Sequence, residues 1–423
     1  MKCPQPGGAP GSTGESMSTV ANRTSSLNAA KAAKNDEFYT QWADIEREVN
    51  AYLEFDPDVF RDKVVLLPCD DPEWSNFAKF FALHFVNLGL KKLISASYAP
   101  DSNPATFSYE PTLFELDDPK FDPTKSRANG KKFILEPKDL NGDDVINIDD
   151  LHWEYLEGDG DFRSAEVTAL RDEADIIITN PPFSLFREFL TWIQEGGKQF
   201  SIIGNENAIA YKNVFRLIKD NKIWKGATAN STDMVFAVPK GTVVKEADRL
   251  KAEKLGYPSD GEHEYTRLGN SCWFTNIEHG RRHEPLQLMS MEDNLRYNKK
   301  LVSTLDGGTE YQRYDNFDAI EVPYTDAIPS DYDGVMGVPI TWLAKYNPDQ
   351  FEILGTDETD YEPTKTYKSK RKVVNGSPVK SNTGSGGGYI RAESFGSGTF
   401  FDVGYPVKRM YKRIFIRHRK AAS

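Results

Sequence analysis

The chain has few cysteines, no long apolar run and no glycine-rich phosphate-binding turn. Its three cysteines, Cys3, Cys69 and Cys272, are far apart within 423 residues and form no CxxC pair. This spacing argues against a zinc site and against a disulfide framework, and it favours a reducing cytoplasm. No apolar run approaches the roughly 18 residues of a membrane-spanning helix, and the six histidines show no metal-ligand spacing. We therefore expect a globular protein with no membrane segment and no catalytic metal.

The N-terminal residues 1–34 lack the apolar core of a signal peptide. Residues 1–26 are rich in Gly, Pro, Ser and Thr, a composition typical of disordered segments. We expect a disordered tail here, with Met17 as a second candidate for the start of translation.

From residue 64 to residue 277, short apolar runs alternate with segments of helical periodicity. This order predicts a parallel α/β sheet of the open, doubly wound kind, in which ligands bind at the carboxyl ends of the strands. Residues 99–138 are polar and rich in proline, and residues 99–150 as a whole are expected to form an insertion. Strands are expected at residues 64–68, 92–98, 132–135, 152–156, 175–179, 200–204, 234–238 and 272–277. Helices are expected from about residue 40 and at residues 75–88, 165–173, 185–194, 208–219 and 245–254.

The most informative motif is Asn180-Pro181-Pro182-Phe183, which follows the apolar run 175–179. A strand that ends in Asn-Pro-Pro-aromatic is the active-site signature of enzymes that methylate an exocyclic or amide nitrogen. The Asn180 side-chain carbonyl and the Pro181 carbonyl are two acceptors for the two hydrogens of an NH2 group. The prolines stiffen the turn, and Phe183 offers a flat face on which an extruded base stacks. The alternative is an ordinary strand, a proline-rich turn and a helix start.

Acidic residues follow two other predicted strands. Asp70 and Asp71 occupy the first strand end, where many nucleotide-binding folds carry a glycine-rich turn. Carboxylates suit a cofactor with a cationic aminoacyl group, such as S-adenosylmethionine, better than they suit a pyrophosphate. Asp161 and Phe162, near a later strand end, form a second acidic and aromatic pair for the adenine of that cofactor. The alternative for both loops is an acid that faces a helix N-terminus.

Cys69 supports a rival interpretation. Cytosine carbon methylation uses a Pro-Cys nucleophile with a Glu-Asn pair, and Glu206-Asn207 is present. This rival leaves the Asn-Pro-Pro-Phe turn unexplained, and a buried structural cysteine is the more common state. Trp273 and Phe274, on a late strand, are candidates to stack on the base opposite Phe183, although such pairs are equally often core residues.

Residues 139–150 resemble a calcium-binding loop. Oxygen-bearing side chains stand at its first, third, fifth and last positions, but the sixth position is not glycine and the last is not glutamate. The candidate calcium ligands are Asp139, Asn141, Asp143 and Asp150, and the alternative is an acidic solvent-exposed loop.

Positive charge is scarce overall but concentrated near the C-terminus. The net charge is −12, yet residues 361–423 contain 14 Lys and Arg against three acids, with aromatic residues interleaved. A charge run is often only a solvated face. Beside a motif for base methylation, however, contact with phosphates is the better interpretation. The candidate DNA-binding residues are Lys370, Arg371, Lys372, Lys408, Arg409, Lys412 and Arg413.

Seven segments between residues 35 and 355 resemble the EcoRI-type adenine-specific DNA methyltransferases. They are NDEFYTQ (35–41), VVLLPCDDP (64–72), GDGDFRS (158–164), TNPPFSLFRE (179–188), IGNENA (203–208), CWFTN (272–276) and DGVMGVPITWL (333–343). The resemblance implies a Rossmann-like methyltransferase fold, S-adenosylmethionine as the methyl donor, and N6 of adenine in double-stranded DNA as the acceptor. By position, Tyr39, Asp70, Asp161 and Phe162 are implied to contact the cofactor, and Asn180, Pro181 and Phe183 to hold the base.

The expected organisation is a catalytic domain at 35–280 and a target-recognition region at 281–423 that includes the basic tail 361–423. A monomeric cytoplasmic enzyme of a restriction-modification or phage type is expected, with a cognate restriction endonuclease as a candidate partner. N4-cytosine, RNA adenine and protein glutamine methylation remain open alternatives, as does a DNA-binding protein without activity.

Overall fold

The computed structural model describes most of the chain. The described residues are 38–72, 75–99, 118–140, 142, 144–228, 234–239, 242, 244–261, 263–268, 270–305, 308–380, 386–391 and 398–419. The predicted tail, Cys3 and two candidate calcium ligands, Asn141 and Asp143, lie outside this set. No helix in the described part has the length and apolarity that a membrane crossing requires.

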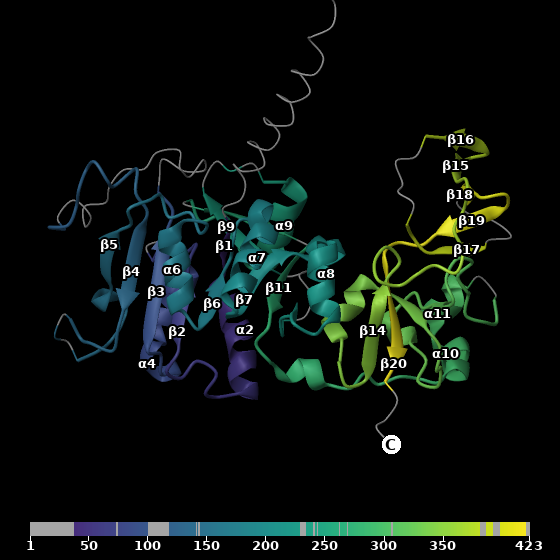
Figure 1. Ribbon diagram of the computed structural model, residues 1–423, viewed down its shortest axis with the longest axis horizontal. Helices are drawn as coiled ribbons and strands as arrows, with labels where there is room; N and C mark the ends of the chain where they lie inside the picture. The colour runs from purple at the N-terminus through teal and green to yellow at the C-terminus, as the bar shows by residue number, and fades with distance from the viewer. Residues whose placement is uncertain are drawn as a thin grey trace, which may run out of the picture.

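An eight-stranded mixed sheet forms the centre of the larger lobe (Figure 1), in the order β5-β4-β3-β2-β6-β7-β11-β8. Strands β3, β2, β6 and β7 are parallel neighbours, whereas β4, β5, β11 and β8 add antiparallel edges. The mixed α/β class is therefore confirmed. The strands are β2 (Val64–Leu67), β3 (Lys92–Ser97), β4 (Lys131–Leu135), β5 (His152–Tyr155), β6 (Ile176–Thr179), β7 (Gln199–Asn205), β8 (Trp224–Lys225) and β11 (Ser271–Thr275).

Helices cover both faces of this sheet. Side chains of a strand alternate between its two faces, and on β6 Ile177 belongs to one hydrophobic cluster while Ile176 and Ile178 belong to another. The first cluster is completed by α6 (Ala165–Glu173), α7 (Phe186–Gly196) and α8 (Lys212–Lys219). The second is completed by α2 (Trp42–Phe55), α3 (Asn76–Leu83) and α4 (Phe85–Leu88).

Two expectations about elements were wrong. The helix expected at residues 75–88 is broken at His84 into α3 and α4, and it ends at Gly89 in the left-handed conformation. The strand expected at 234–238 forms as β9 (Val235–Pro239), but it lies in a separate three-stranded sheet. Its neighbours there are β1 (Tyr39–Thr40) and β10 (His263–Arg267). The expected helix at 245–254 forms as α9 (Glu246–Lys254).

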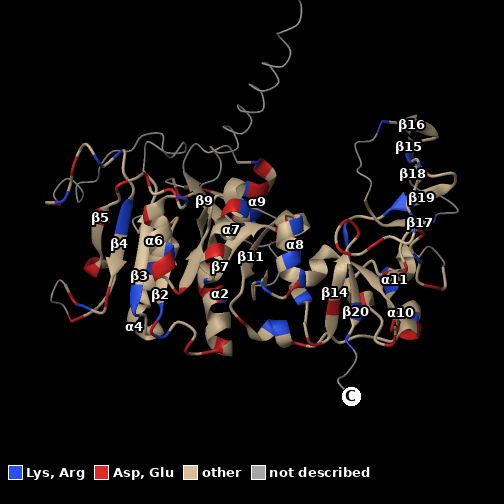
Figure 2. Cartoon of the chain, viewed as in Figure 1, with Lys and Arg blue, Asp and Glu red and all other residues tan. Residues whose placement is uncertain are grey.

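The smaller lobe is built from residues beyond about 290 (Figure 1). It contains α10 (Met291–Tyr297), α11 (Lys299–Thr304) and a four-stranded sheet of β12 (Ile320–Glu321), β13 (Met336–Pro339), β20 (Arg413–His418) and β14 (Phe351–Thr356). A five-stranded sheet at its end consists of β16 (Ser377–Val379), β15 (Arg371–Val374), β18 (Thr399–Asp402), β19 (Pro406–Arg409) and β17 (Tyr389–Arg391). Figure 2 shows basic residues on β19. The domain boundary at residue 280 stays a prediction, and one hydrophobic cluster includes side chains from both sides of it, such as Phe274 and Ile414.

Candidate active site

The Asn-Pro-Pro-Phe turn lies at the carboxyl end of β6, in the middle of the large sheet. The Asn180 side-chain Nδ2 donates a hydrogen bond to the Phe38 carbonyl oxygen at 2.6 Å. Its Oδ1 is buried and has no hydrogen-bond partner among the described residues. A buried acceptor without a partner costs roughly 1–3 kcal/mol, so such an atom marks a place where a ligand N–H is expected. The amide orientation that Phe38 fixes presents the acceptor, and not the donor, for this purpose.

The ring beside Phe183 belongs to Phe38. The two ring centroids are 5.6 Å apart with an interplanar angle of 25°, which is a stacked arrangement. The Phe38 ring also packs edge-on against Phe236 of β9, with centroids 5.8 Å apart. Phe38 was not among the predicted site residues, although it precedes Tyr39 in the NDEFYTQ segment.

The structure corrects the expectation for Trp273 and Phe274. Trp273 is 2% exposed and packs edge-on against Phe77, whereas Phe274 is fully buried against Phe186. Because they are adjacent on β11, their side chains point to opposite faces of the sheet, and each belongs to a different hydrophobic cluster. Both are core residues, and neither ring lies against Phe183.

Asp70 connects the loop after β2 to the strand that carries Asn180. It is buried, and its two carboxylate oxygens accept hydrogen bonds of 2.6 Å from the hydroxyls of Ser75 and Thr179. The Ser95 hydroxyl donates to the Asp70 carbonyl oxygen. Since these internal bonds engage both carboxylate oxygens, Asp70 acts by positioning two loops. Ser75 and Thr179, which complete this bridge, could not be identified from the sequence.

The pKa of Asp70 gives a testable pH dependence. Burial raises this pKa from 3.8 to about 6, and the hydrogen bonds from Ser75 and Thr179 act in the opposite direction. Because the folded protein holds the proton more tightly than the unfolded chain does, the stability from Asp70 is fully present below about pH 4 and is lost as the pH rises through about 6. An Asp70→Asn variant should lose this component, which is about 3 kcal/mol for such a shift.

Urea unfolding of both proteins at low and neutral pH measures this component. The stability difference between the two pH values should be smaller in the Asp70→Asn variant than in the unmodified protein. An equal difference in both proteins would contradict the assignment.

The other predicted cofactor residues lie at the same carboxyl edge of the sheet. The loop after β5 packs on the end of β3, where the Ala99 N–H donates to the Asp159 carbonyl at 2.7 Å. A hydrogen-bonded ion pair with Arg163 lowers the pKa of Asp161. Phe162 is 5% exposed and packs edge-on against Phe189, so most of its ring belongs to the core.

The segment 38–41 contacts both the Asn180 turn, through Phe38, and the start of α3, through Thr40. The Thr40 carbonyl accepts a hydrogen bond of 2.8 Å from the Asn76 side chain, and Tyr39 pairs with Ala237 of β9. The Thr40 hydroxyl is buried and has no hydrogen-bond partner among the described residues. Asp71 is partly exposed in the loop that leads into α3. A second buried polar atom without a partner among the described residues, and a partly exposed acid, therefore accompany Asn180.

Cys69 does not have the environment of a nucleophile. Burial, with a smaller effect from the Asp70 charge, raises the pKa of its thiol far above the ordinary value. Only the thiolate is an effective nucleophile. The Glu206 carboxylate of the rival interpretation is engaged by the Lys225 ammonium at 2.6 Å. A Cys69→Ser variant should therefore retain methylation in a transfer assay, whereas loss of transfer with intact folding and cofactor binding would revive the rival.

The candidate calcium loop is held by its own acids. Asp139 accepts hydrogen bonds from the backbone N–H groups of Gly142 and Asp144, and Asp150 accepts from those of Leu140 and Asn147. Among the residues that the structure describes, no cluster of acids, histidines or cysteines has a geometry for a metal ion. With Asn141 and Asp143 outside that set, calcium binding stays a prediction.

Some of the candidate DNA-binding residues contact other side chains of the protein, and the others show no ion pair among the described residues. Arg413 is buried, and its guanidinium donates to both oxygens of Glu321 at 2.6–3.1 Å, which corrects its assignment to a DNA-binding surface. Ion pairs to Glu358 engage Arg409 at 3.1 Å and Lys412 at 3.6 Å. The Lys370 ammonium donates to the Tyr389 hydroxyl at 3.3 Å. Three residues of the five-stranded sheet show no ion pair within the described set and keep their candidate role: Arg371, Lys372 and Lys408.

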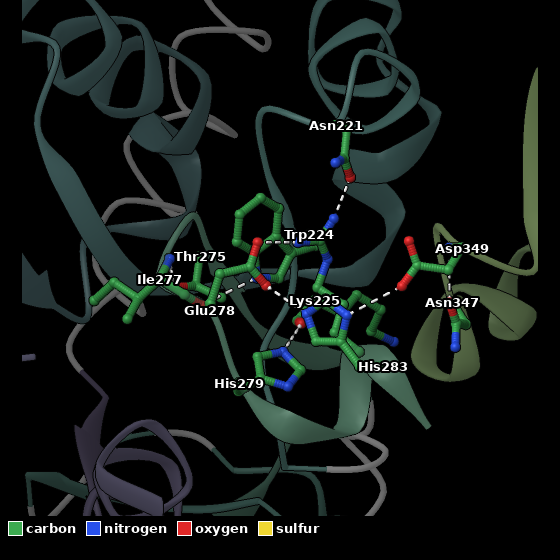
Figure 3. A network of polar contacts seen from close by, with 11 residues as sticks. Asn221, Trp224, Lys225, Thr275, Ile277, Glu278, His279, His283, Asn347 and Asp349 are labelled. Atoms are coloured by element: carbon green, nitrogen blue, oxygen red, sulfur yellow. Dashed lines mark hydrogen bonds and ion pairs between the residues drawn. The ribbon is translucent and has the colours of Figure 1, made fainter. Parts of the chain in front are cut away.

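A polar network joins the two lobes (Figure 3). Arg282 lies in the 3-10 helix η5 (Gly280–His283), where it donates to Glu278 and Asn221 and its guanidinium carbon lies 3.6 Å from the Trp224 ring centroid. His283 contacts Glu278 at 3.2 Å and Asp349 of the smaller lobe at 3.3 Å. These contacts fix the chain where it leaves the large sheet, and their role is structural.

The chain is similar to known methyltransferases over most of its length. The family model for the adenine-specific methyltransferase EcoRI matches residues 26–395. The type II methyltransferase M.EcoRI of Escherichia coli is 41% identical over 338 residues, which cover 79% of this chain and 91% of the relative. M.MpnI of Mycoplasma pneumoniae is 34% identical over 82% of this chain and 90% of its own length, and M.MgeORF184P of Mycoplasma genitalium is 31% identical over 82% and 91%. No solved structure gives a significant match. The chain belongs to the EcoRI family of adenine-specific methyltransferases.

Proposed function

We propose that this protein is a site-specific DNA methyltransferase that transfers a methyl group from S-adenosylmethionine to N6 of an adenine flipped out of double-stranded DNA. The observation that carries the proposal is the buried Oδ1 of Asn180, an acceptor without a partner at the end of a central strand. The relatives named type II methyltransferases and the adenine-specific family support the choice of substrate.

In this mechanism the turn holds the amine by its two hydrogens. One N–H of the adenine amine donates to Asn180 Oδ1 and the other to the Pro181 carbonyl, which orients the nitrogen lone pair toward the methyl group. The same two acceptors would stabilise the positive charge that develops on the nitrogen as the N–C bond forms and the bond from the methyl group to the donor sulfur breaks. The methylated nitrogen would then release one of its two protons to solvent, and S-adenosylhomocysteine would be the other product. Phe183 supplies a stacking face for the base, and the Phe38 carbonyl keeps the Asn180 amide in the required orientation.

The fold is proposed to be the Rossmann-like fold of S-adenosylmethionine-dependent methyltransferases. The cofactor supplies an electrophilic methyl group on a sulfonium centre. Asp71 and Asp161 are candidates to bind its cationic and hydroxyl groups, with Tyr39 and the Thr40 hydroxyl beside them. Asp70 holds the loop after β2 against Thr179, so that the cofactor and the base are presented to each other in a fixed geometry.

Residues 281–423 are proposed to recognise the target sequence. The phosphate contacts are assigned to the basic residues of the five-stranded sheet that lack ion pairs, namely Arg371, Lys372 and Lys408. We further propose that the enzyme acts as a monomer within a restriction-modification or phage modification system.

Single-molecule sequencing of DNA from cells that express the chain tests the proposal. N6-methyladenine should occur at one short recurring sequence, and it should be missing in cells that express an Asn180→Ala variant. Detection of N4-methylcytosine in place of N6-methyladenine would show that the substrate is cytosine, the nearest alternative. Unmodified DNA, with labelled methyl groups in RNA or protein, would overturn the proposal.

A further inference from the structure

An exposed arginine and an exposed tyrosine stack on each other beside the Asn-Pro-Pro-Phe turn. The Arg187 guanidinium carbon lies 4.8 Å from the centroid of the Tyr211 ring, and 43% of the Tyr211 surface is exposed. Arg187 lies in the first turn of α7, four residues after Phe183. Tyr211 directly follows the 3-10 helix η3 (Glu206–Ala210), which begins at the end of β7.

The topology places this pair at the rim of the proposed base site. Strands β6 and β7 are parallel and adjacent, so the segments that follow them leave the sheet at the same edge. The turn after β6 leads into Arg187, and the turn after β7 leads into Tyr211. The cation therefore lies at the edge to which an extruded nucleotide must bring its phosphates.

Among the described residues, Arg187 forms no ion pair, whereas two other exposed arginines of the larger lobe do. Arg163 contacts Asp161 and Glu188, and Arg216 contacts Asp360 at 3.2 Å. Glu188, the acid next to Arg187 in sequence, is thus already paired with Arg163.

Stacking on a ring prepares a guanidinium to bind an anion. The aromatic face restricts the side-chain rotamers and leaves the in-plane N–H donors of the guanidinium directed at the solvent. Those donors match the geometry of a phosphate group, to which arginine binds through two parallel hydrogen bonds.

We infer that Arg187 and Tyr211 form a binding site for a backbone phosphate of the DNA strand that carries the flipped base. This inference rests on the proposed function. It assigns a phosphate contact to the catalytic lobe in addition to those of the five-stranded sheet, and it gives a binding partner to the Arg187 guanidinium.

The salt dependence of DNA binding tests the inference. The probe is an unmethylated duplex with the recognition sequence that sequencing identifies. Its binding to the protein is measured in the presence of S-adenosylhomocysteine over a range of NaCl concentrations. Each phosphate contact contributes about 0.9 to the slope of log affinity against log salt. Arg187→Ala should make the slope shallower by that amount. The ratio of the affinity of the unmodified protein to that of the variant should therefore fall roughly threefold when the salt is raised from about 50 to about 200 mM.

Three further variants control for other causes. Arg187→Lys keeps the charge and should keep most of the slope. Tyr211→Ala keeps the charge but loses the stacking, so it should weaken binding at every salt concentration with little change in slope. Arg216→Ala removes an equal charge from an exposed position on α8, but its partner is Asp360, and its slope should match that of the unmodified protein.

The outcomes separate this inference from the proposed function. An unchanged slope in Arg187→Ala, or equal losses of slope in Arg187→Ala and Arg216→Ala, would overturn the phosphate site alone. If the unmodified protein does not bind the duplex, the proposed function and this inference fail together. Calorimetric binding of S-adenosylmethionine by each variant verifies that its catalytic lobe is folded.

Discussion

An Asn180→Ala variant is expected to transfer methyl groups at least about 10²- to 10³-fold more slowly than the unmodified enzyme, the effect typical of removing one preorganised polar group from a reacting centre. The reason is that Asn180 Oδ1 is the buried acceptor without a partner at the end of β6. Its loss leaves the amine held by the Pro181 carbonyl alone. Single-turnover transfer of labelled methyl groups to the target duplex measures the rate, and calorimetry should show nearly unchanged affinity for S-adenosylmethionine.

Two comparisons make this prediction specific. Asn180→Asp keeps an acceptor but loses the hydrogen bond from Nδ2 to the Phe38 carbonyl, so it separates the acceptor role from the orientation of the amide. Asn207→Ala changes an exposed asparagine at the neighbouring strand end and should leave the rate intact. Transfer at a nearly normal rate by Asn180→Ala would remove the basis of the proposed mechanism.

The second large effect concerns stability and the smaller lobe. Arg413→Ala is expected to lower the free energy of unfolding by about 3–5 kcal/mol, because removal of one partner leaves a buried charge uncompensated. The charge left behind is that of Glu321, which is 3% exposed and also accepts a hydrogen bond from the Tyr314 hydroxyl. Urea unfolding monitored by circular dichroism measures the loss.

A matched control lies on the same strand. Arg417 pairs with Glu352 at 2.7 Å, but both side chains are more than 40% exposed, and exposed pairs contribute about 0–1 kcal/mol. Arg417→Ala should therefore cost little. Replacing Arg413 and Glu321 together by apolar residues of similar size should recover much of the loss. Similar small losses in Arg413→Ala and Arg417→Ala would show that burial of the Arg413 pair does not increase its contribution to stability.

The sequence predicted those features that depend on neighbouring residues. The apolar runs at 64–68 and 175–179 form β2 and β6 almost to the residue, and the Asn-Pro-Pro-Phe turn lies at the strand end where it was expected. Local apolar pattern and turn chemistry are sufficient for such assignments.

Features that depend on distant partners were not predictable in this way. Asn180 and Phe38 are 142 positions apart, and Arg413 and Glu321 are 92 apart. A count of basic residues cannot distinguish Arg413, at the start of a buried strand, from the exposed Lys408. The separate sheet of β9 was not predictable either, because β9 pairs with Tyr39 and Thr40, which are almost 200 positions away in the sequence.

In the base-free enzyme the ring of Phe38 stacks on Phe183 and covers a face on which the substrate base could stack. A base that uses the covered face of Phe183 must displace this ring, whose aromatic contact contributes about 0.5–1.5 kcal/mol, and it gains about 1–3 kcal/mol by stacking. The exchange leaves only a small net gain. In the proposed mechanism, retention of an extruded base then depends on the hydrogen bonds to Asn180 and Pro181, so we expect bases without an amine at that position to return to the duplex.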